Sequence, residues 1–145
     1  MRRIIKIVVV CFISIVLNSV SAFAEDSNTD DTGSFDWEPV MQAVIQVESE
    51  GNTNAVKGKS CGAMQITPIL VAECNNILKK RKSKKRYNLK DRFNLSKSKE
   101  MFVLIQSYFN PTNNIEQAIR SWNGGIHYNV KRTQRYFEKV MSFIK

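Results

Sequence analysis

One glutamate in the first amphipathic segment stands where an acidic side chain is unexpected. Apolar residues recur at helical spacing over residues 36–50 and form a stripe made of Trp37, Val40, Met41, Val44 and Val47. At about 100° per residue, Glu48 lies about 40° from Val44 and inside the stripe, whereas Glu50 lies about 120° away on the polar side. A carboxyl group among apolar neighbours loses hydration, which raises its pKa. Glu48 is therefore a candidate proton donor; the alternative is a glutamate at a frayed helix end, in contact with water.

The segments that must position this glutamate are predicted to be helical, because no stretch of period-two alternation interrupts them. Five helices are expected near residues 36–50, 68–78, 96–109, 113–124 and 129–144. Thr67 followed by Pro68 predicts the start of the second helix, since a capping residue precedes a proline at the first helical position. Asn113 with Glu116 predicts a capping box at the start of the fourth. The fold is expected to be all-α, or nearly so.

The first 24 residues have the pattern of a secretory signal peptide. Three cationic side chains occupy the first six positions, a mostly apolar run follows from residue 7 to 17, and Ala22-Phe23-Ala24 forms a cleavage site. The alternative is a membrane anchor, but the run contains Ser14 and falls short of the ~20 apolar residues of a spanning helix. We expect cleavage after Ala24, export to the periplasm, cell wall or medium, and no stable membrane insertion afterwards.

The remainder is expected to be one basic domain. Removing 24 of the 145 residues leaves 121, enough for a single modest core. Residues 25–34 have no apolar side chain and are expected to form a flexible leader, so the domain spans residues 35–145. The signal contains three of the 22 basic residues and none of the 13 acidic ones, which leaves a net charge of +6. Such a chain suits an anionic surface such as a cell wall, and nucleic acid is not an expected partner.

Export also determines what the cysteines are expected to do. Cys11 belongs to the signal, so Cys61 and Cys74 remain in an oxidising compartment and are expected to form one disulfide. The alternative is two buried free thiols.

A metal site is not expected, because the only histidine, His127, lacks a cluster of ligands around it. No cofactor is expected.

Four short segments occur in an order and spacing that a known family shares. They are Glu48-Ser49 at a helix end followed by Asn and Ala, Gly-Ala-Met-Gln-Ile at 62–66, Trp-Asn-Gly-Gly at 122–125, and Tyr136 in the last helix. These segments resemble the soluble lytic transglycosylase catalytic domain, a relative of goose-type lysozyme. The resemblance covers about residues 37–145 and implies a lysozyme-like single domain.

The resemblance also implies a reaction and a role for each matched residue. Glu48 would be the single catalytic acid and base, supported by substrate-binding or positioning residues Ser49, Met64, Gln65, Asn123 and Tyr136. The expected partner is the glycan strand of peptidoglycan, cleaved between N-acetylmuramic acid and N-acetylglucosamine. The muramic C6 hydroxyl would attack the anomeric carbon and leave a 1,6-anhydro end. Trp122 stands where the family more often has tyrosine, and Cys61 is a local addition.

Other functions remain open from the sequence. One is a hydrolytic muramidase of the same fold, although hydrolases usually use two carboxylates, and neither Glu73 nor Asp91 belongs to a matched segment. Another is a noncatalytic peptidoglycan-binding or secretion-apparatus scaffold, which the costly burial of Glu48 disfavours. A monomer is expected, and an envelope-spanning secretion or conjugation apparatus is a further partner left open. The basic stretch 79–86 is either a solvated surface or a site of attraction to anionic wall polymers.

Overall fold

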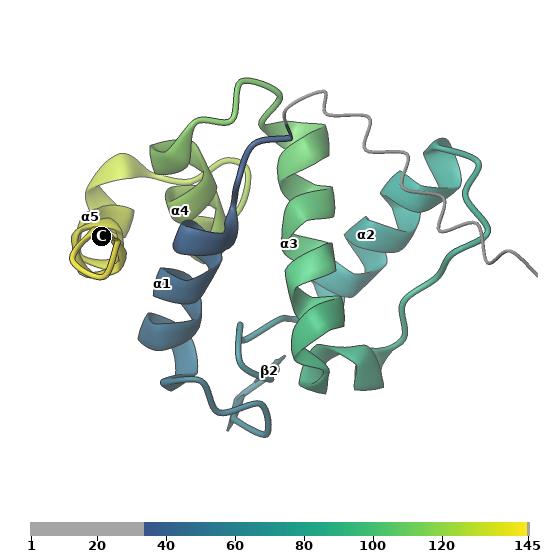
Figure 1. The fold of residues 1–145 in the computed structure, drawn as a ribbon, viewed down its shortest axis with the longest axis horizontal. Helices are drawn as coiled ribbons and strands as arrows, with labels where there is room; N and C mark the ends of the chain where they lie inside the picture. The colour runs from purple at the N-terminus through teal and green to yellow at the C-terminus, as the bar shows by residue number, and fades with distance from the viewer. Residues whose placement is uncertain (1–33, 145) are drawn as a thin grey trace, which may run out of the picture. The chain divides into compact units, whose positions relative to one another are not determined.

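A computed structural model describes residues 34–144, and in this part of the chain helices predominate (Figure 1). The helices are α1 (Glu38–Ser49), α2 (Pro68–Lys80), α3 (Leu95–Phe109), α4 (Ile115–Gly124) and α5 (Val130–Met141), with a 3-10 helix η1 (Leu89–Phe93) before α3. The prediction of a mostly helical domain is confirmed. None of these helices is long and apolar enough to span a membrane. The predicted signal peptide and all but the last residue of the predicted leader lie outside the described residues.

Side-chain caps explain where most of the helices begin. The Thr67 hydroxyl accepts a hydrogen bond from the Leu70 amide at 3.2 Å, so the predicted start of α2 is confirmed. The capping residue predicted for α4 was wrong by one position. Asn114 is the cap, because its side chain accepts from the Gln117 amide at 2.8 Å, whereas Asn113 precedes it with a left-handed φ of 53°.

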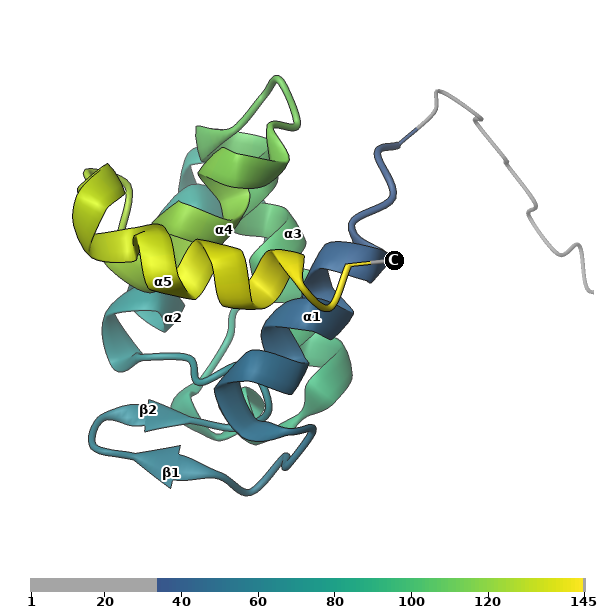
Figure 2. The same ribbon diagram turned by 90° about the vertical axis from the view of Figure 1, so that its left-hand side faces the viewer.

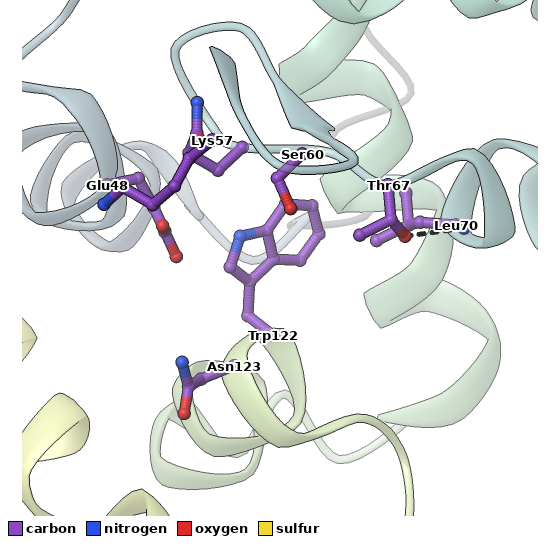
Figure 3. Close-up of a pocket in the computed structure, with 8 residues that line it drawn as sticks. Glu48, Lys57, Ser60, Thr67, Leu70, Trp122 and Asn123 are labelled. Carbon is purple, nitrogen blue, oxygen red and sulfur yellow. Dashed lines mark hydrogen bonds between the residues drawn. The ribbon is translucent and has the colours of Figure 1, made fainter. Parts of the chain in front are cut away.

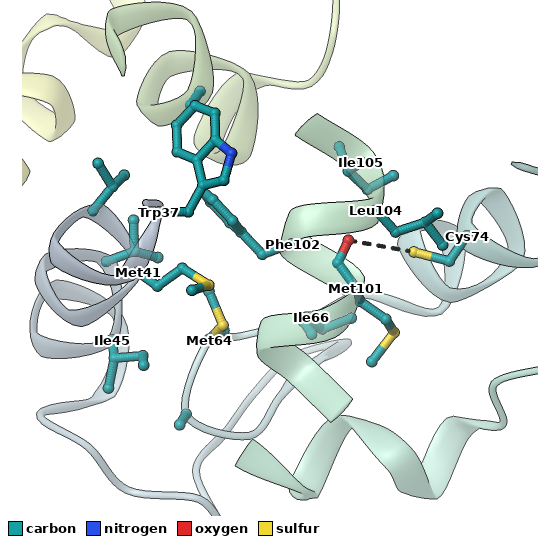
Figure 4. Packing of buried hydrophobic residues seen from close by; sticks show 14 of the residues in the cluster. Trp37, Met41, Ile45, Met64, Ile66, Cys74, Met101, Phe102, Leu104 and Ile105 are labelled. Carbon is teal, nitrogen blue, oxygen red and sulfur yellow. Dashed lines mark hydrogen bonds between the residues drawn. The ribbon is translucent and has the colours of Figure 1, made fainter. Parts of the chain in front are cut away.

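The core is built around α3, whose inner face contacts the helices on both sides (Figure 4). Phe102 is fully buried, and its ring lies 5.7 Å from that of Trp37 and 5.0 Å from that of Trp122. These aromatic contacts connect the start of α1 to the end of α4 through α3. Because truncating a buried phenylalanine costs about 3–5 kcal/mol, this cluster is expected to hold α1, α3 and the end of α4 firmly together.

A short β-hairpin, which the sequence analysis did not predict, follows α1. Strands β1 (Val56–Lys57) and β2 (Ser60–Cys61) pair in antiparallel fashion, with Lys57 opposite Ser60. Figure 2 shows the hairpin near the C-terminal end of α1, and α5 lying across α1 and α4, with which it is in contact. Strands of two residues are too short to show period-two alternation, which is why the sequence pattern gave no sign of them.

A buried arginine ties η1 to the hairpin. The Arg92 guanidinium donates to the carbonyl oxygens of Leu89 at 2.8 Å, Lys59 at 3.0 Å and Ile66 at 3.3 Å. The contact is so close that a Cβ added to Gly62 would lie 1.8 Å from the Arg92 carbonyl oxygen. Only glycine fits at this position, which also has a left-handed φ of 78°.

The predicted disulfide is absent: Cys61 and Cys74 are free thiols, and both are buried. The Cys74 sulfur faces α3, where it lies 3.8 Å from the carbonyl oxygen of Met101. Cys61 lies in β2, and its backbone pairs with Ile66. The disulfide was predicted because Cys61 and Cys74 are close in sequence, but α2 directs Cys74 toward α3. Burial raises the pKa of the Cys74 thiol to about 12, so it remains protonated as a core side chain.

Candidate active site

The last turn of α1 places Glu48 at a pocket of about 180 Å³ (Figure 3). The helix ends immediately after it, because Glu50 adopts a left-handed φ of 55° and the chain leaves toward the hairpin. Glu50 is exposed and does not line the pocket. The described residues that line it are Glu48, Lys57, Ser60, Gln65, Thr67, Leu70, Trp122 and Asn123. The pocket therefore lies between the end of α1, the hairpin and turn that follow it, the start of α2 and the end of α4.

A tyrosine from the last helix holds the Glu48 carboxyl group. The Tyr136 hydroxyl donates a hydrogen bond of 2.7 Å to Glu48 Oε1. Burial raises the pKa of Glu48, and this effect exceeds the opposing influence of the Tyr136 hydrogen bond and of the ammonium groups of Lys57 and Lys139. Burial and the adjacent carboxyl group also raise the pKa of Tyr136 well above its usual value, so its hydroxyl remains a donor. Glu48 is thus a carboxyl group that keeps its proton more readily than an exposed one.

Glu48 is the only carboxylate among the described residues that line the pocket. The two acids considered from the sequence are engaged elsewhere. Glu73 accepts a hydrogen bond from its neighbour Asn76 on α2. Asp91 forms an ion pair of 2.7 Å with Lys97 and closes the capping box of η1. The geometry therefore offers one group for proton transfer and no partner carboxylate in the pocket.

Gln65 lines the same pocket and has a buried side-chain oxygen without a partner in residues 34–144. Its side chain is buried, and its amide nitrogen donates to the carbonyl oxygens of Gly62 at 2.9 Å and Ala55 at 3.3 Å. The side-chain oxygen has no partner among the described residues, and the backbone has a left-handed φ of 51°. A buried unpaired acceptor costs about 1–3 kcal/mol, so this turn is held in place at a cost to stability.

The other predicted site residues divide between the pocket and its support. Asn123 lines the pocket. Ser49 does not, and its hydroxyl donates to the Ala63 carbonyl oxygen at 2.8 Å, which joins the end of α1 to the turn before Gln65. The Met64 side chain is fully buried in the core, and its carbonyl oxygen accepts from the Trp122 indole at 3.2 Å. Ser49 and Met64 therefore do not line the pocket, and their hydrogen bonds hold the segments around it in place.

Five described residues that line the pocket were not among the predicted site residues: Lys57, Ser60, Thr67, Leu70 and Trp122, the last noted only as part of a matched segment. Two of them lie in the hairpin, whose strands the pattern did not predict. Thr67 had been noted only as a helix cap. Within residues 34–144, no group of three or more histidine, cysteine or acidic side chains is arranged to hold a metal ion.

Comparison of the chain with protein-family models, with curated proteins and with solved structures found no match in any of the three.

Proposed function

We propose that this chain is an exported lytic transglycosylase with a lysozyme-like catalytic domain. It cleaves the β-1,4 bond between N-acetylmuramic acid and N-acetylglucosamine in peptidoglycan, and it acts as a monomer in the periplasm or cell wall. One observation carries the proposal: the partly buried carboxyl group of Glu48, held by Tyr136, is the only carboxylate that residues 34–144 contribute to its pocket. The convergence of Glu48, Gln65 and Asn123 on one pocket adds support, because the motif resemblance had grouped the same residues.

The reaction needs one proton donor that later becomes an acceptor. Glu48 protonates the glycosidic oxygen, the bond from that oxygen to the muramic anomeric carbon breaks, and N-acetylglucosamine leaves with a free C4 hydroxyl. The muramic C6 oxygen forms the new bond to the anomeric carbon, and its proton passes to the Glu48 carboxylate. No water is consumed, and Glu48 regains its proton. An attacking hydroxyl in the same molecule has a high effective concentration, so a second carboxylate is not required.

The balance of influences on Glu48 suits both halves of this cycle. Burial favours the protonated form that begins the reaction, while Tyr136, Lys57 and Lys139 stabilise the carboxylate formed during it. A hydrolytic muramidase would need a further group to activate water. A noncatalytic scaffold would gain nothing from a partly buried carboxyl group that destabilises the fold. A secretion or conjugation apparatus is a compatible partner for an enzyme as well as for a scaffold. No contact of the described residues supports this partner.

The test compares two neighbouring glutamates on purified peptidoglycan. Glu48→Gln is expected to abolish release of soluble fragments, because the amide is nearly isosteric but cannot donate the proton. Glu50→Gln is the matched control and is expected to keep wild-type activity, since Glu50 is exposed and outside the pocket. Circular dichroism and sedimentation with the wall polymer verify fold and binding for both variants. Activity in Glu48→Gln, or its loss in Glu50→Gln alone, would contradict the assignment.

A further inference from the structure

The hairpin presents a cation and a hydroxyl together at the pocket. Lys57 and Ser60 are directly paired across β1 and β2, and both line the pocket. Residues directly opposite one another in an antiparallel pair project from the same face of the sheet. Figure 3 shows Lys57 and Ser60 at the pocket, each coming from one strand of the hairpin. An ammonium group and a hydroxyl that line one pocket from the same face of a hairpin can both donate to a bound oxyanion.

The charge of Lys57 is not used by the fold. Lys57 is the only cationic residue among the described residues of the pocket, and it takes part in none of the ion pairs found within residues 34–144. Most lysines in this region likewise form no ion pair, and Lys57 differs from them in lining the pocket. The charged group that Lys57 does influence is Glu48, where it favours loss of the proton. Lys57 therefore stabilises the Glu48 carboxylate, and its ammonium group, which has no ion-pair partner within residues 34–144, can also bind an anionic group of a ligand.

The hairpin is also held in place before any ligand arrives. Arg92 donates to the Lys59 carbonyl oxygen in the turn, and the Gly62 amide donates to the Ala55 carbonyl oxygen at 2.8 Å. The first bond ties the hairpin turn to η1, and the second joins the two strands at the open end of the hairpin. The backbone of Lys57 is therefore positioned in advance, and only its side chain loses freedom when a ligand binds.

We propose that Lys57 and Ser60 form a carboxylate-binding subsite that recognises the acidic substituent of the glycan strand, an inference that rests on the proposed function. Muramic acid carries a lactyl group at C3. Its carboxylate is free where the strand has no peptide and forms an amide where a stem peptide is attached. The stem peptide carries carboxylates of its own. Both sources have the same chemistry, a carboxylate close to the bond that is cut.

Binding of this carboxylate changes the charge felt by Glu48. The groups that face Glu48 are Tyr136 and Lys139 from α5 and Lys57 from β1. A carboxylate paired with Lys57 offsets its positive field, which leaves burial as a stronger influence and favours the protonated acid. An acidic substrate thus helps to keep the proton that its own cleavage requires, and a neutral glycan does not.

The test uses a disaccharide that the proposed reaction cannot cleave. N-acetylglucosaminyl-N-acetylmuramic acid lacks the bond from muramic acid to the next sugar, so it reports binding alone. Three forms are titrated into the protein by NMR: the free lactyl carboxylate, its neutral methylamide, and the disaccharide with a stem peptide. The wild type is expected to bind the carboxylate about fivefold more tightly than the methylamide, the gain of an exposed charge pair. If the form with a stem peptide binds as tightly as the free acid, the stem peptide is a second source of the carboxylate that is bound. If it binds like the methylamide, the lactyl group is the only source of that carboxylate.

Variants separate this subsite from general attraction by charge. Lys57→Met is expected to remove the preference for the carboxylate, and Lys57→Arg is expected to keep it. Lys59→Met is the matched control, because it removes the same charge from an exposed side chain of the hairpin turn that does not line the pocket. Equal affinity of the wild type for acid and methylamide, no binding of any form, or an equal loss in Lys59→Met would overturn the subsite. Failure of the proposed function looks different: the carboxylate is preferred, but whole strands are not cleaved.

Discussion

Tyr136 on α5 donates a hydrogen bond of 2.7 Å to Glu48 on α1, across 88 positions of the chain. The bond makes the candidate acid depend on the packing of the last helix against the first. It also opposes the effect of burial, because a donor to the carboxylate lowers the pKa of Glu48. Tyr136 is therefore a positioning residue with a measurable electrostatic effect.

We predict that Tyr136→Phe shifts the pH dependence of cleavage upward. Loss of the donor raises the pKa of Glu48, so the alkaline limb of kcat/KM, where the acid loses its proton, moves to higher pH. The maximum rate is expected to fall about tenfold or more, because the carboxyl group is less well oriented. Tyr108→Phe is the control, since Tyr108 is exposed on α3 and outside the pocket. An unchanged or downward-shifted limb would contradict the role of Tyr136.

We predict that Glu48→Gln stabilises the fold at neutral and alkaline pH. The folded state holds the Glu48 proton more tightly than the unfolded state, because burial raises the pKa of Glu48. Its contribution to stability is therefore fully present below the ordinary value of 4.5 and is lost as pH rises through the folded pKa. Glutamine avoids that loss. Urea unfolding over a pH series checks the prediction, and a stability difference that widened on acidification would contradict it.

We predict that Gly62→Ala is far more destabilising than Gly58→Ala. Both glycines have a left-handed φ, so alanine is strained at either position by about 1 kcal/mol or more. A Cβ at Gly58 meets open space, whereas at Gly62 it meets the Arg92 backbone. Thermal unfolding of the two variants gives the comparison. Similar melting temperatures would show that the approach of η1 to the hairpin is looser than described.

We predict that Arg92→Met loosens the hairpin and lowers activity, and that Arg92→Lys does not restore either. The guanidinium donates to three carbonyl oxygens, two of them in partly buried bonds and that of Ile66 in a buried one, so the loss of these bonds is expected to cost about 1–3 kcal/mol. The single ammonium group of lysine cannot reproduce the planar set of N–H donors of the guanidinium. Hydrogen exchange at the Gly62 and Cys61 amides is expected to accelerate. The exposed Arg135→Met serves as control, and full rescue by lysine would show that charge alone matters.

Local patterns in the sequence were enough to predict the helices and the candidate acid. The stripe on α1 predicted Glu48 on the buried side, and Thr67 marked the start of α2 because a cap depends on residues only three positions apart. The same locality explains the one-residue error at α4, where Asn113 and Asn114 are equally suitable caps by type. The backbone conformation of Asn113 decides between them.

Features that depend on tertiary contacts were not predictable from the pattern. The buried free thiols follow from how α2 faces α3, which spacing between Cys61 and Cys74 does not encode. Lys57 reaches the pocket because a two-residue strand pairs it with Ser60. The unpaired oxygen of Gln65 depends on a turn held by distant residues. Each of these involves contacts between elements, where sequence periodicity carries no information.

The most direct test of the central claim is the origin of the oxygen at the newly formed glycan end. Purified peptidoglycan is digested in heavy-oxygen water, and the soluble fragments are analysed by mass spectrometry. We predict 1,6-anhydro-N-acetylmuramic acid ends that carry no label and are lighter than hydrolysed ends by one water, because the C6 hydroxyl attacks in place of water. Heavy oxygen at new reducing ends would contradict the account, since it would show that water attacks with the help of a group other than the single carboxylate Glu48.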